Sequence, residues 1–144
     1  MLADRTVTDL YLRVQHFYAR QMQAVDEGRF AEYADTFAED GTFQHSPNVE
    51  PARGRAAILQ SLIDYDERFT GEPVQRRHWF NQIVLDEQPD GSFRSTVYAL
   101  VVATKPGTRL PFEIAPACIV HDVLEVSGDV ILTRSRLVTY DYLG

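Results

Sequence analysis

The sequence contains little cysteine, few basic residues and no long apolar run. Cys118 is the only cysteine in 144 residues, so the chain cannot form an internal disulfide and nothing in it requires an oxidising compartment. Its 14 Lys and Arg residues against 21 Asp and Glu give a net charge of −7, which argues against a nucleic-acid-binding surface. No stretch approaches the length of a transmembrane helix, and the charged first residues lack the apolar core of a signal peptide. We therefore expect a cytoplasmic protein that binds neither nucleic acid nor a membrane.

Motifs for metals and common cofactors are also missing. The four histidines, at positions 16, 45, 78 and 121, show no close metal-ligand spacing, and one cysteine cannot build a zinc site. The sequence has no glycine-rich phosphate-binding loop and no serine or cysteine in a recognisable nucleophile setting. We expect no metal and no other cofactor, and Cys118 is most simply a small buried hydrophobic residue.

The N-terminal half shows helical periodicity within what we expect to be a single domain, residues 1–144. Apolar residues recur at helical spacing, and Gly28 and the Asp40-Gly41 turn separate the segments. The expected elements are a helix from Thr6 or Thr8 to Glu27, a short helix over 29–38, a strand over 42–45 and a helix over 52–69.

The C-terminal half reads as four long strands, over 75–87, 92–104, 112–126 and 129–141. Turn sequences join the first pair and the last pair, which suits an antiparallel meander. Helices followed by such a sheet define the α+β class, with the helices on one sheet face. Because one long sheet cannot press all its inner surface against three helices, we expect a cone with a small-molecule pocket at its open end.

Two stretches resemble a known family. FAEDGTFQHSP followed by GRAAI, and RRHWFNQIVLDEQPDG, are similar to segments of SnoaL-like proteins in the nuclear transport factor 2-like superfamily, and the similarity covers about residues 8–141. The resemblance implies a cone-shaped α+β barrel, with three N-terminal helices packed on a strongly curved antiparallel sheet around an internal pocket. It also implies a homodimer through the outer sheet face. The apolar residues on both faces of the strand from Val97 to Val102 agree with this.

His45 is the first candidate catalytic residue. The ketosteroid isomerases of this superfamily have a similar stretch, and their catalytic aspartate falls on His45 when the two are aligned without a gap. The resemblance therefore implies that His45 faces the pocket and moves a proton. An imidazole can do so near neutrality because its ordinary pKa is about 6.5. The alternative is a histidine that holds the following loop in shape by hydrogen bonding.

The strand RRHWFNQIVL supplies further candidates. Alternation places His78, Phe80 and Gln82 on one face and Trp79, Asn81 and Ile83 on the other, so His78 and Asn81 share the pocket only if a bulge intervenes. The family's Arg-His-x-x-Asn motif, which this strand resembles, favours His78 as the pocket residue. The alternative is a core histidine with satisfied hydrogen bonds. Trp79 and Asn81 remain candidates for substrate binding.

The first helix carries two candidate hydrogen-bond donors. Tyr18 lies on the apolar stripe, where a buried hydroxyl needs a partner such as a ligand carbonyl or a water molecule. The oxyanion tyrosine of the similar isomerases falls on Gln21, three residues further along the same helical face. Tyr33, Phe37 and Tyr98 suit a pocket for a large apolar substrate, and they suit a core equally well.

Asp122 follows His121 on a predicted strand, so one of the two side chains points inward. Members of the family often carry a second acidic group near this position. An aspartate held neutral in an apolar pocket could donate a hydrogen bond to an enolate. The commoner arrangement is a salt bridge on the solvent side, here with Arg134 or Arg136.

These residues predict a cofactor-independent acid/base enzyme with a hydrophobic, polyketide-like substrate. The resemblance points to a cyclase of secondary-metabolite biosynthesis, with isomerisation or dehydration of a carbonyl compound as variants. His45 would move the proton, while Tyr18, His78 or Gln21 would donate hydrogen bonds to the oxygen that gains charge. Two alternatives remain: a noncatalytic scaffold similar to a ring-hydroxylating dioxygenase β subunit, and a module that binds a hydrophobic ligand without turnover.

Overall fold

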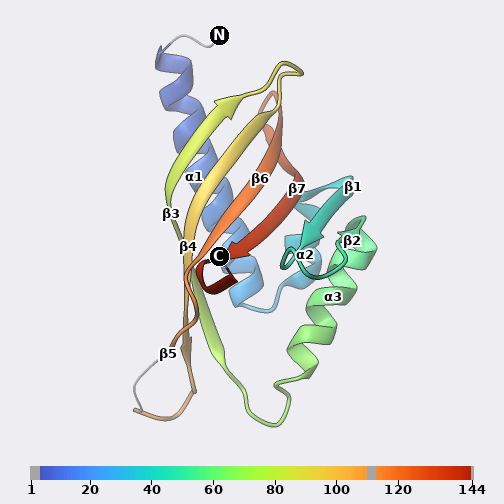
Figure 1. Cartoon of the computed structure of the whole chain (residues 1–144), viewed down its shortest axis with the longest axis vertical. Helices are drawn as coiled ribbons and strands as arrows, with labels where there is room; N and C mark the ends of the chain where they lie inside the picture. The colour runs from blue at the N-terminus through green and yellow to red at the C-terminus, as the bar shows by residue number, and fades with distance from the viewer. Residues whose placement is uncertain (1–3, 110–112, 144) are drawn as a thin grey trace.

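The computed structural model describes residues 4–109 and 113–143, and it consists of helices on one side of a curved sheet (Figure 1). The helices are α1 (Asp4–Asp26), α2 (Phe30–Asp35) and α3 (Arg55–Glu67). The strands are β1 (Phe37–Gln44), β2 (Ala52–Arg53), β3 (Gln75–Glu87), β4 (Phe93–Thr104), β5 (Glu113–Ile114), β6 (Cys118–Ser127) and β7 (Val130–Tyr140), and a 3₁₀ helix follows at Asp141–Leu143.

The strands form one sheet in the order β2-β1-β7-β6-β4-β3, with β5 paired to β4. The predicted antiparallel meander is confirmed for β3, β4, β6 and β7. The pair β1 and β7 is parallel, which the sequence analysis did not predict. Parallel neighbours need a long connection, and β1 and β7 are separated by α3 and most of the sheet, so the chain can return in the same direction.

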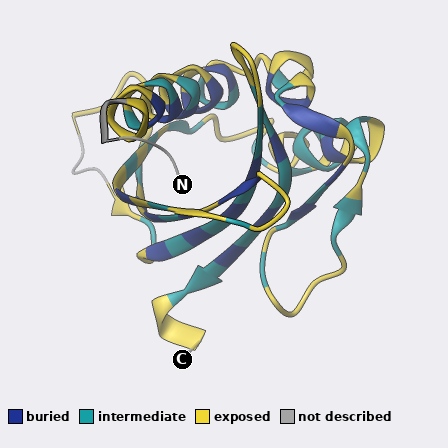
Figure 2. Ribbon diagram, turned by 90° about the horizontal axis from the view of Figure 1, so that it is seen from above, coloured by how far each residue is buried: buried dark blue, intermediate teal, exposed yellow. Residues whose placement is uncertain are grey.

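The helix α1 covers the concave face of the sheet with an apolar stripe. Leu10, Val14, Tyr18 and Met22 follow one another at four-residue spacing and are all buried, because residues i and i+4 lie on the same helical face. Seen from above, the sheet curls strongly without closing, and α1 runs along one side of the curl (Figure 2). The predicted cone of three helices on a curved sheet is thereby confirmed.

The second helix is shorter than predicted, because sheet pairing begins before the helical pattern ends. The expected helix over 29–38 stops early, and Phe37 instead begins β1. The carbonyl of Thr36 accepts a hydrogen bond from the amide of Thr133 on β7 at 2.9 Å. The strand expected over 42–45 is correspondingly longer, and it ends immediately before His45.

The third long strand, expected over 112–126, is interrupted. Its residue 112 lies outside the described residues, and the remainder divides into β5 and β6. Pro116 lies between them, and a proline has no amide hydrogen to donate to a strand ladder. The amide of Ala115 instead donates to the carbonyl of Val101 at 2.8 Å, which holds this connection against β4 and beside the cavity described below.

A bulge in β3 decides which side chains face inward. The register with β4 shifts between Asn81 and Val84, and Gln82 takes a positive φ of 56°. Ile83 is consequently buried, so its predicted place on the same face as Trp79 is wrong. The bulge follows Asn81 and therefore leaves that side chain on the exposed outer face.

Candidate active site

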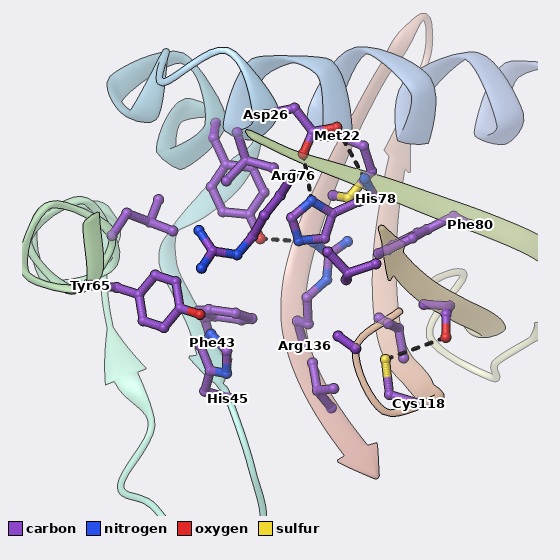
Figure 3. A pocket seen from close by; sticks show the side chains of 18 of the residues that line it. Met22, Asp26, Phe43, His45, Tyr65, Arg76, His78, Phe80, Cys118 and Arg136 are labelled. Atoms are coloured by element: carbon purple, nitrogen blue, oxygen red, sulfur yellow. Dashed lines mark hydrogen bonds and ion pairs between the residues drawn. The ribbon is translucent and has the colours of Figure 1, made fainter. Parts of the chain in front are cut away.

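A cavity of about 250 Å³ lies between the concave sheet face and the helices. Side chains from α1, α2, α3, β1, β3, β4, β6 and β7 line it, and most of them are apolar. Asp26, His45, Arg76, His78 and Arg136 are polar exceptions that converge on this space (Figure 3). An apolar cavity with a few convergent polar groups is the usual form of a small-molecule site.

His78 and Asp26 form a hydrogen-bonded pair in the cavity wall. The Nδ1 atom of His78, on β3, lies 2.5 Å from Oδ1 of Asp26, the last residue of α1, and the His78 amide donates to Oδ2 at 3.1 Å (Figure 3). Their side chains are 26% and 6% exposed. An ionised carboxylate can only accept hydrogen bonds, so the proton of a neutral imidazole lies on Nδ1 and the lone pair on Nε2. The pair therefore provides a base that is held in one orientation.

His45 lies at the rim of the same cavity, directly after β1. The residue is exposed, but one side of its ring packs against Phe43, with centroids 5.2 Å apart, and the other stacks on Tyr65 at 5.9 Å. Burial among these side chains lowers the pKa of His45, although a hydrogen bond between the ring and the residue's own backbone opposes the shift. The Tyr140 hydroxyl lies 3.4 Å from His45 Nδ1, and burial raises the pKa of Tyr140 to about 12. His45 therefore lines the cavity as a neutral imidazole at neutral pH.

The lowered pKa of His45 predicts a pH-dependent stability. The unfolded chain takes up a proton at this imidazole near its ordinary pKa of about 6.5, whereas the folded protein resists protonation until the pH is lower. Protonation thus favours the unfolded state, and stability falls as the pH drops below that ordinary value. Urea unfolding at about pH 7.5 and about pH 5.5 should show a smaller loss for His45→Phe, which keeps the ring contacts, than for the wild type. An equal loss in both proteins would contradict the shift.

A buried ion pair joins Arg136, which lines the cavity, to Asp122 behind the cavity wall. Arg136, on β7, donates from Nε and Nη2 to the two carboxylate oxygens of Asp122 at 2.9 and 2.7 Å, and these residues are 3% and 1% exposed. The Tyr18 hydroxyl is hydrogen-bonded to Asp122 Oδ2 at 2.9 Å and to Ser95 Oγ at 2.8 Å. Burial, followed by the charge of Asp122, raises the pKa of Tyr18 well above its ordinary value. Burial alone would lower the pKa of Arg136, but the charge and hydrogen bonds of Asp122, together with Tyr33 and Tyr18, outweigh it and the pKa is raised.

This ion pair corrects the expectation for Asp122. Its partner is Arg136, as one alternative proposed, but the pair lies inside the protein and not on the solvent side. Arg134 pairs with Glu125 and Asp90. Strand alternation turns Asp122 inward, and both of its oxygens are occupied by Arg136 and Tyr18. Neither Asp122 nor Tyr18 lines the cavity, so direct contact with a substrate, which was expected for both, is not available to them.

Gln21 and Tyr33 extend the same network in different ways. Gln21 is fully buried; its Oε1 accepts from Arg136 Nη2 at 2.6 Å and its Nε2 donates to the Thr36 hydroxyl at 2.7 Å, so it does not reach the cavity. Tyr33 lines the cavity, and its hydroxyl oxygen accepts from Arg136 Nη1 at 2.9 Å. Within the described part of the chain, no acceptor takes the hydroxyl hydrogen of Tyr33. That hydrogen is available to a ligand oxygen.

The structure does not bring the other four predicted side chains to the cavity, contrary to expectation. Trp79 and Tyr98 are 63% and 58% exposed on the outer face of the sheet, and Asn81 is exposed beside them. Phe37 is completely buried and packs against Tyr33, with ring centroids 5.4 Å apart, behind the cavity wall. Strand alternation explains the first three, and the early start of β1 explains Phe37.

Four charged cavity residues were not predicted: Asp26, Asp66, Arg76 and Arg136. A signal was present for Arg76, because it lies two residues before His78 on the same strand face. Asp26 and Arg136 come from elements far from β3 in sequence, and only the folded chain brings them beside it.

Among the described residues, no group of three or more His, Cys, Asp and Glu side chains could hold a metal ion. No described helix is long and apolar enough to cross a membrane.

The curved sheet, the covering helices and the enclosed cavity define a cone-shaped fold of the NTF2-like superfamily. Within it, the profile of the SnoaL-like domain matches residues 6–136, and the chain belongs to the SnoaL-like family. The family resemblance carried by the two sequence stretches is therefore confirmed. No curated protein sequence matches the chain significantly.

Several solved structures are similar in both sequence and fold. ActVI-ORFA from Streptomyces Coelicolor is 44% identical, with a TM-score of 0.85 over 93% of this chain and 98% of that chain. A protein from Catenulispora Acidiphila in complex with S-DNPA is 44% identical, with a TM-score of 0.84 over 94% of this chain and 96% of that chain. Aln2 from a further Streptomyces species is 32% identical, with a TM-score of 0.83 over 94% of this chain and 93% of that chain.

Proposed function

We propose that this protein is a cofactor-independent acid/base enzyme of secondary-metabolite biosynthesis that acts on a polyketide or a similar hydrophobic carbonyl compound. The observation that carries the proposal is the His78–Asp26 pair, which leaves a free imidazole nitrogen in a largely apolar cavity. Membership of the SnoaL-like family, which includes polyketide cyclases, supports the substrate class. The S-DNPA complex of the similar Catenulispora Acidiphila protein supports a small-molecule ligand. Ring closure is the proposed reaction, with isomerisation and dehydration as variants.

The first step is removal of a proton from the carbon next to the substrate carbonyl by Nε2 of His78. A positioned general base contributes roughly two to four orders of magnitude in rate. The carbonyl oxygen gains negative charge as the proton leaves. The Tyr33 hydroxyl donates a hydrogen bond to this oxygen, and the guanidinium of Arg136, 2.9 Å from the Tyr33 oxygen, stabilises the charge through it. The apolar walls hold a flexible substrate so that its reacting atoms meet.

His45 completes the proton transfer from the rim of the cavity. Its neutral imidazole can receive the proton of an incoming hydroxyl group, a role that His78 cannot fill while it carries the substrate proton. A leaving oxygen instead takes up a proton, which the imidazolium of His78 can return. The two imidazoles can therefore serve the two substrate atoms that exchange protons during cyclisation or loss of water. These atoms are the α-carbon and an oxygen. The roles of base and acid can exchange between the variants of the reaction.

Incorporation of deuterium tests this proposal without knowledge of the final product. Candidate polyketide carbonyl compounds are incubated with the protein in D₂O, and the α-carbon positions are followed by NMR and mass spectrometry. An acid/base enzyme exchanges the proton that its base removes. Candidates that bind in the cavity without exchange or conversion would favour a ligand-binding module. Stable association with a large iron-containing subunit, again without exchange, would favour a dioxygenase-like scaffold.

We also propose that the protein is a homodimer through the outer face of the sheet. Trp79, Tyr98 and Leu100 form an exposed apolar surface there, with Trp79 opposite Leu100 and Tyr98 opposite Asn81 in the register of β3 and β4. Protein–protein contact sites are among the surfaces that contiguous exposed apolar residues mark. This surface lies on the convex side, so pairing would leave the cavity open.

Changing Trp79 and Tyr98 together to glutamate should convert the dimer to a monomer of 16.4 kDa in light scattering after size exclusion. The four carboxylates brought together in a dimer of the variant would repel one another and lose the apolar contact. Leu12→Glu is the matched control, because Leu12 is similarly exposed at 58% but lies on α1, away from this face. A wild-type protein that is already monomeric at micromolar concentration would overturn the proposal.

A further inference from the structure

Arg76 is the cationic cavity residue that the network described above does not neutralise. Its guanidinium lies over the rings of Phe69 at 4.4 Å and Tyr65 at 5.1 Å, and no described carboxylate lies within ion-pair distance of it. The second cation of the cavity, Arg136, is buried and is held by Asp122. In Figure 3 the guanidinium of Arg76 lies between the His78 side of the cavity and the side formed by Tyr65 and His45.

The setting of Arg76 fits recognition of a planar anion. The Arg76 side chain is partly buried, so water only partly solvates its charge. Stacking on two aromatic rings fixes the plane of the guanidinium and leaves its N–H edge free. That edge matches the two oxygens of a carboxylate in a bidentate geometry. The net charge of −7 repels anions from the protein as a whole, whereas the cation in the cavity attracts an anionic ligand locally.

A monoanion fits this position better than a phosphate dianion does. Asp26 and Asp66 also line the cavity, and their negative charges would repel a second charge on the ligand. One guanidinium fork neutralises one carboxylate. Arg76 and His78 lie two residues apart on the same face of β3, which is a separation of roughly 6.5 Å along the strand. A ligand held by Arg76 can thus present a carbon several bonds from its carboxylate to Nε2 of His78.

We infer that the substrate of this cavity carries a carboxylate, which Arg76 binds at the rim while the apolar carbonyl-bearing body lies against His78. This inference rests on the proposed function and narrows it from a hydrophobic carbonyl compound to a hydrophobic carbonyl acid. Arg76 is then a substrate-binding residue that sets both the affinity and the direction in which the substrate enters.

Binding of an aromatic acid and its neutral analogue tests the inference. Isothermal titration with 2-naphthoate and 2-naphthamide compares one ring system with and without the charge. The wild type should bind the acid at least about tenfold more tightly than the amide, and Arg76→Gln should weaken binding of the acid by about 10- to 100-fold while leaving the amide within about twofold. Arg77→Gln is the matched control: Arg77 is the next residue, it is exposed and it does not line the cavity, so both affinities should persist.

Several results would overturn the inference. These are failure of the acid to bind at millimolar concentration, an equal loss for acid and amide in Arg76→Gln, and the same loss in Arg77→Gln. Thermal melting of each variant shows whether it is folded. The outcome is separable from the proposed chemistry. If the protein prefers the acid but catalyses no deuterium exchange, only the proposed acid/base chemistry is refuted. If the protein catalyses exchange but does not prefer the acid, only the inferred carboxylate of the substrate is refuted.

Discussion

Replacing His78 by alanine is expected to lower kcat for deuterium exchange by about 10²- to 10⁴-fold, with little change in ligand affinity. The substitution removes the only imidazole of the cavity that a carboxylate orients, and it leaves Tyr33, Arg136 and the apolar walls in place. Binding depends on those walls and on Arg76, so the loss should appear in kcat and not in the dissociation constant of 2-naphthoate. Exchange rates at saturating substrate and calorimetric titration of the same preparation measure the two quantities.

Asp26→Asn is expected to give a smaller loss through a change of tautomer. An asparagine can present its NH₂ group to His78 Nδ1, which then accepts, and the proton of the neutral ring moves to Nε2 where the base is needed. The rate should fall by about ten- to a hundredfold, since the imidazolium formed during the reaction also loses its carboxylate partner. An unchanged rate would show that Asp26 only closes the end of α1.

Two comparisons give these results their meaning. His121→Gln is a matched control, because His121 lies on β6 outside the cavity and its ring nitrogen is paired with Thr139 at 2.9 Å. It should leave the rate unchanged. His45→Ala tests the earlier expectation that His45 is the base. If His45→Ala abolishes exchange and His78→Ala does not, the assignment of the two imidazoles proposed above is wrong.

Most helices and strands could be predicted because their patterns are local in sequence. The four-residue stripe from Leu10 to Met22 predicted α1, and alternation from Val97 to Val102 predicted a strand with two apolar faces. Each pattern depends on a single period, so it can be seen without knowledge of the neighbours. The errors arose where pairing overrode a local pattern. Phe37 continues the apolar face of α2, but the hydrogen bond from the Thr133 amide of β7 to the Thr36 carbonyl begins the sheet there.

The site was less accessible from the sequence than the fold. His45 and His78 were predicted and do line one cavity, and of the predicted aromatic contacts Tyr33 does so as well. The partner of His78 could not be predicted, because in the sequence Asp26 is an ordinary acidic residue at the end of a helix. Only the folded chain places it against His78 of β3. Charge pairing is decided by tertiary contact, and a sequence does not show which of several arginines meets a given aspartate.

Tyr18, Gln21 and Asp122 illustrate a second limit. All three were expected to touch substrate, and all three are instead directed at Arg136 or its partner from behind the cavity. The burial of a polar residue can be inferred from an apolar pattern, but its role depends on whether protein or ligand satisfies it. Here the protein satisfies it, and every described buried side-chain nitrogen or oxygen atom has a hydrogen-bond partner.

Replacing Arg136 by methionine is expected to lower the free energy of unfolding by about 3–5 kcal/mol. The change leaves the carboxylate of Asp122, which is 1% exposed, without its cation, and it removes a hydrogen bond from both Gln21 and Tyr33. The cost is large because an unpaired buried charge has neither water nor a counter-ion. For a chain of this length such a loss should lower Tm by roughly 10 °C, which thermal melting and urea unfolding would measure.

The paired change Arg136→Met with Asp122→Leu separates the cost of a broken pair from the worth of the intact pair. Removing both charges leaves no buried ion, and the desolvation that the pair requires is also avoided. We expect the double variant to recover most of the stability lost in Arg136→Met, while its kcat stays low because Tyr33 no longer receives the hydrogen bond of Arg136. Full recovery of stability together with full activity would show that the ion pair serves neither folding nor the oxygen that gains charge. A double variant as unstable as Arg136→Met would instead assign the cost to Gln21, Tyr33 and the packing of the four rings that surround the guanidinium, namely Tyr18, Tyr33, Phe37 and Phe80.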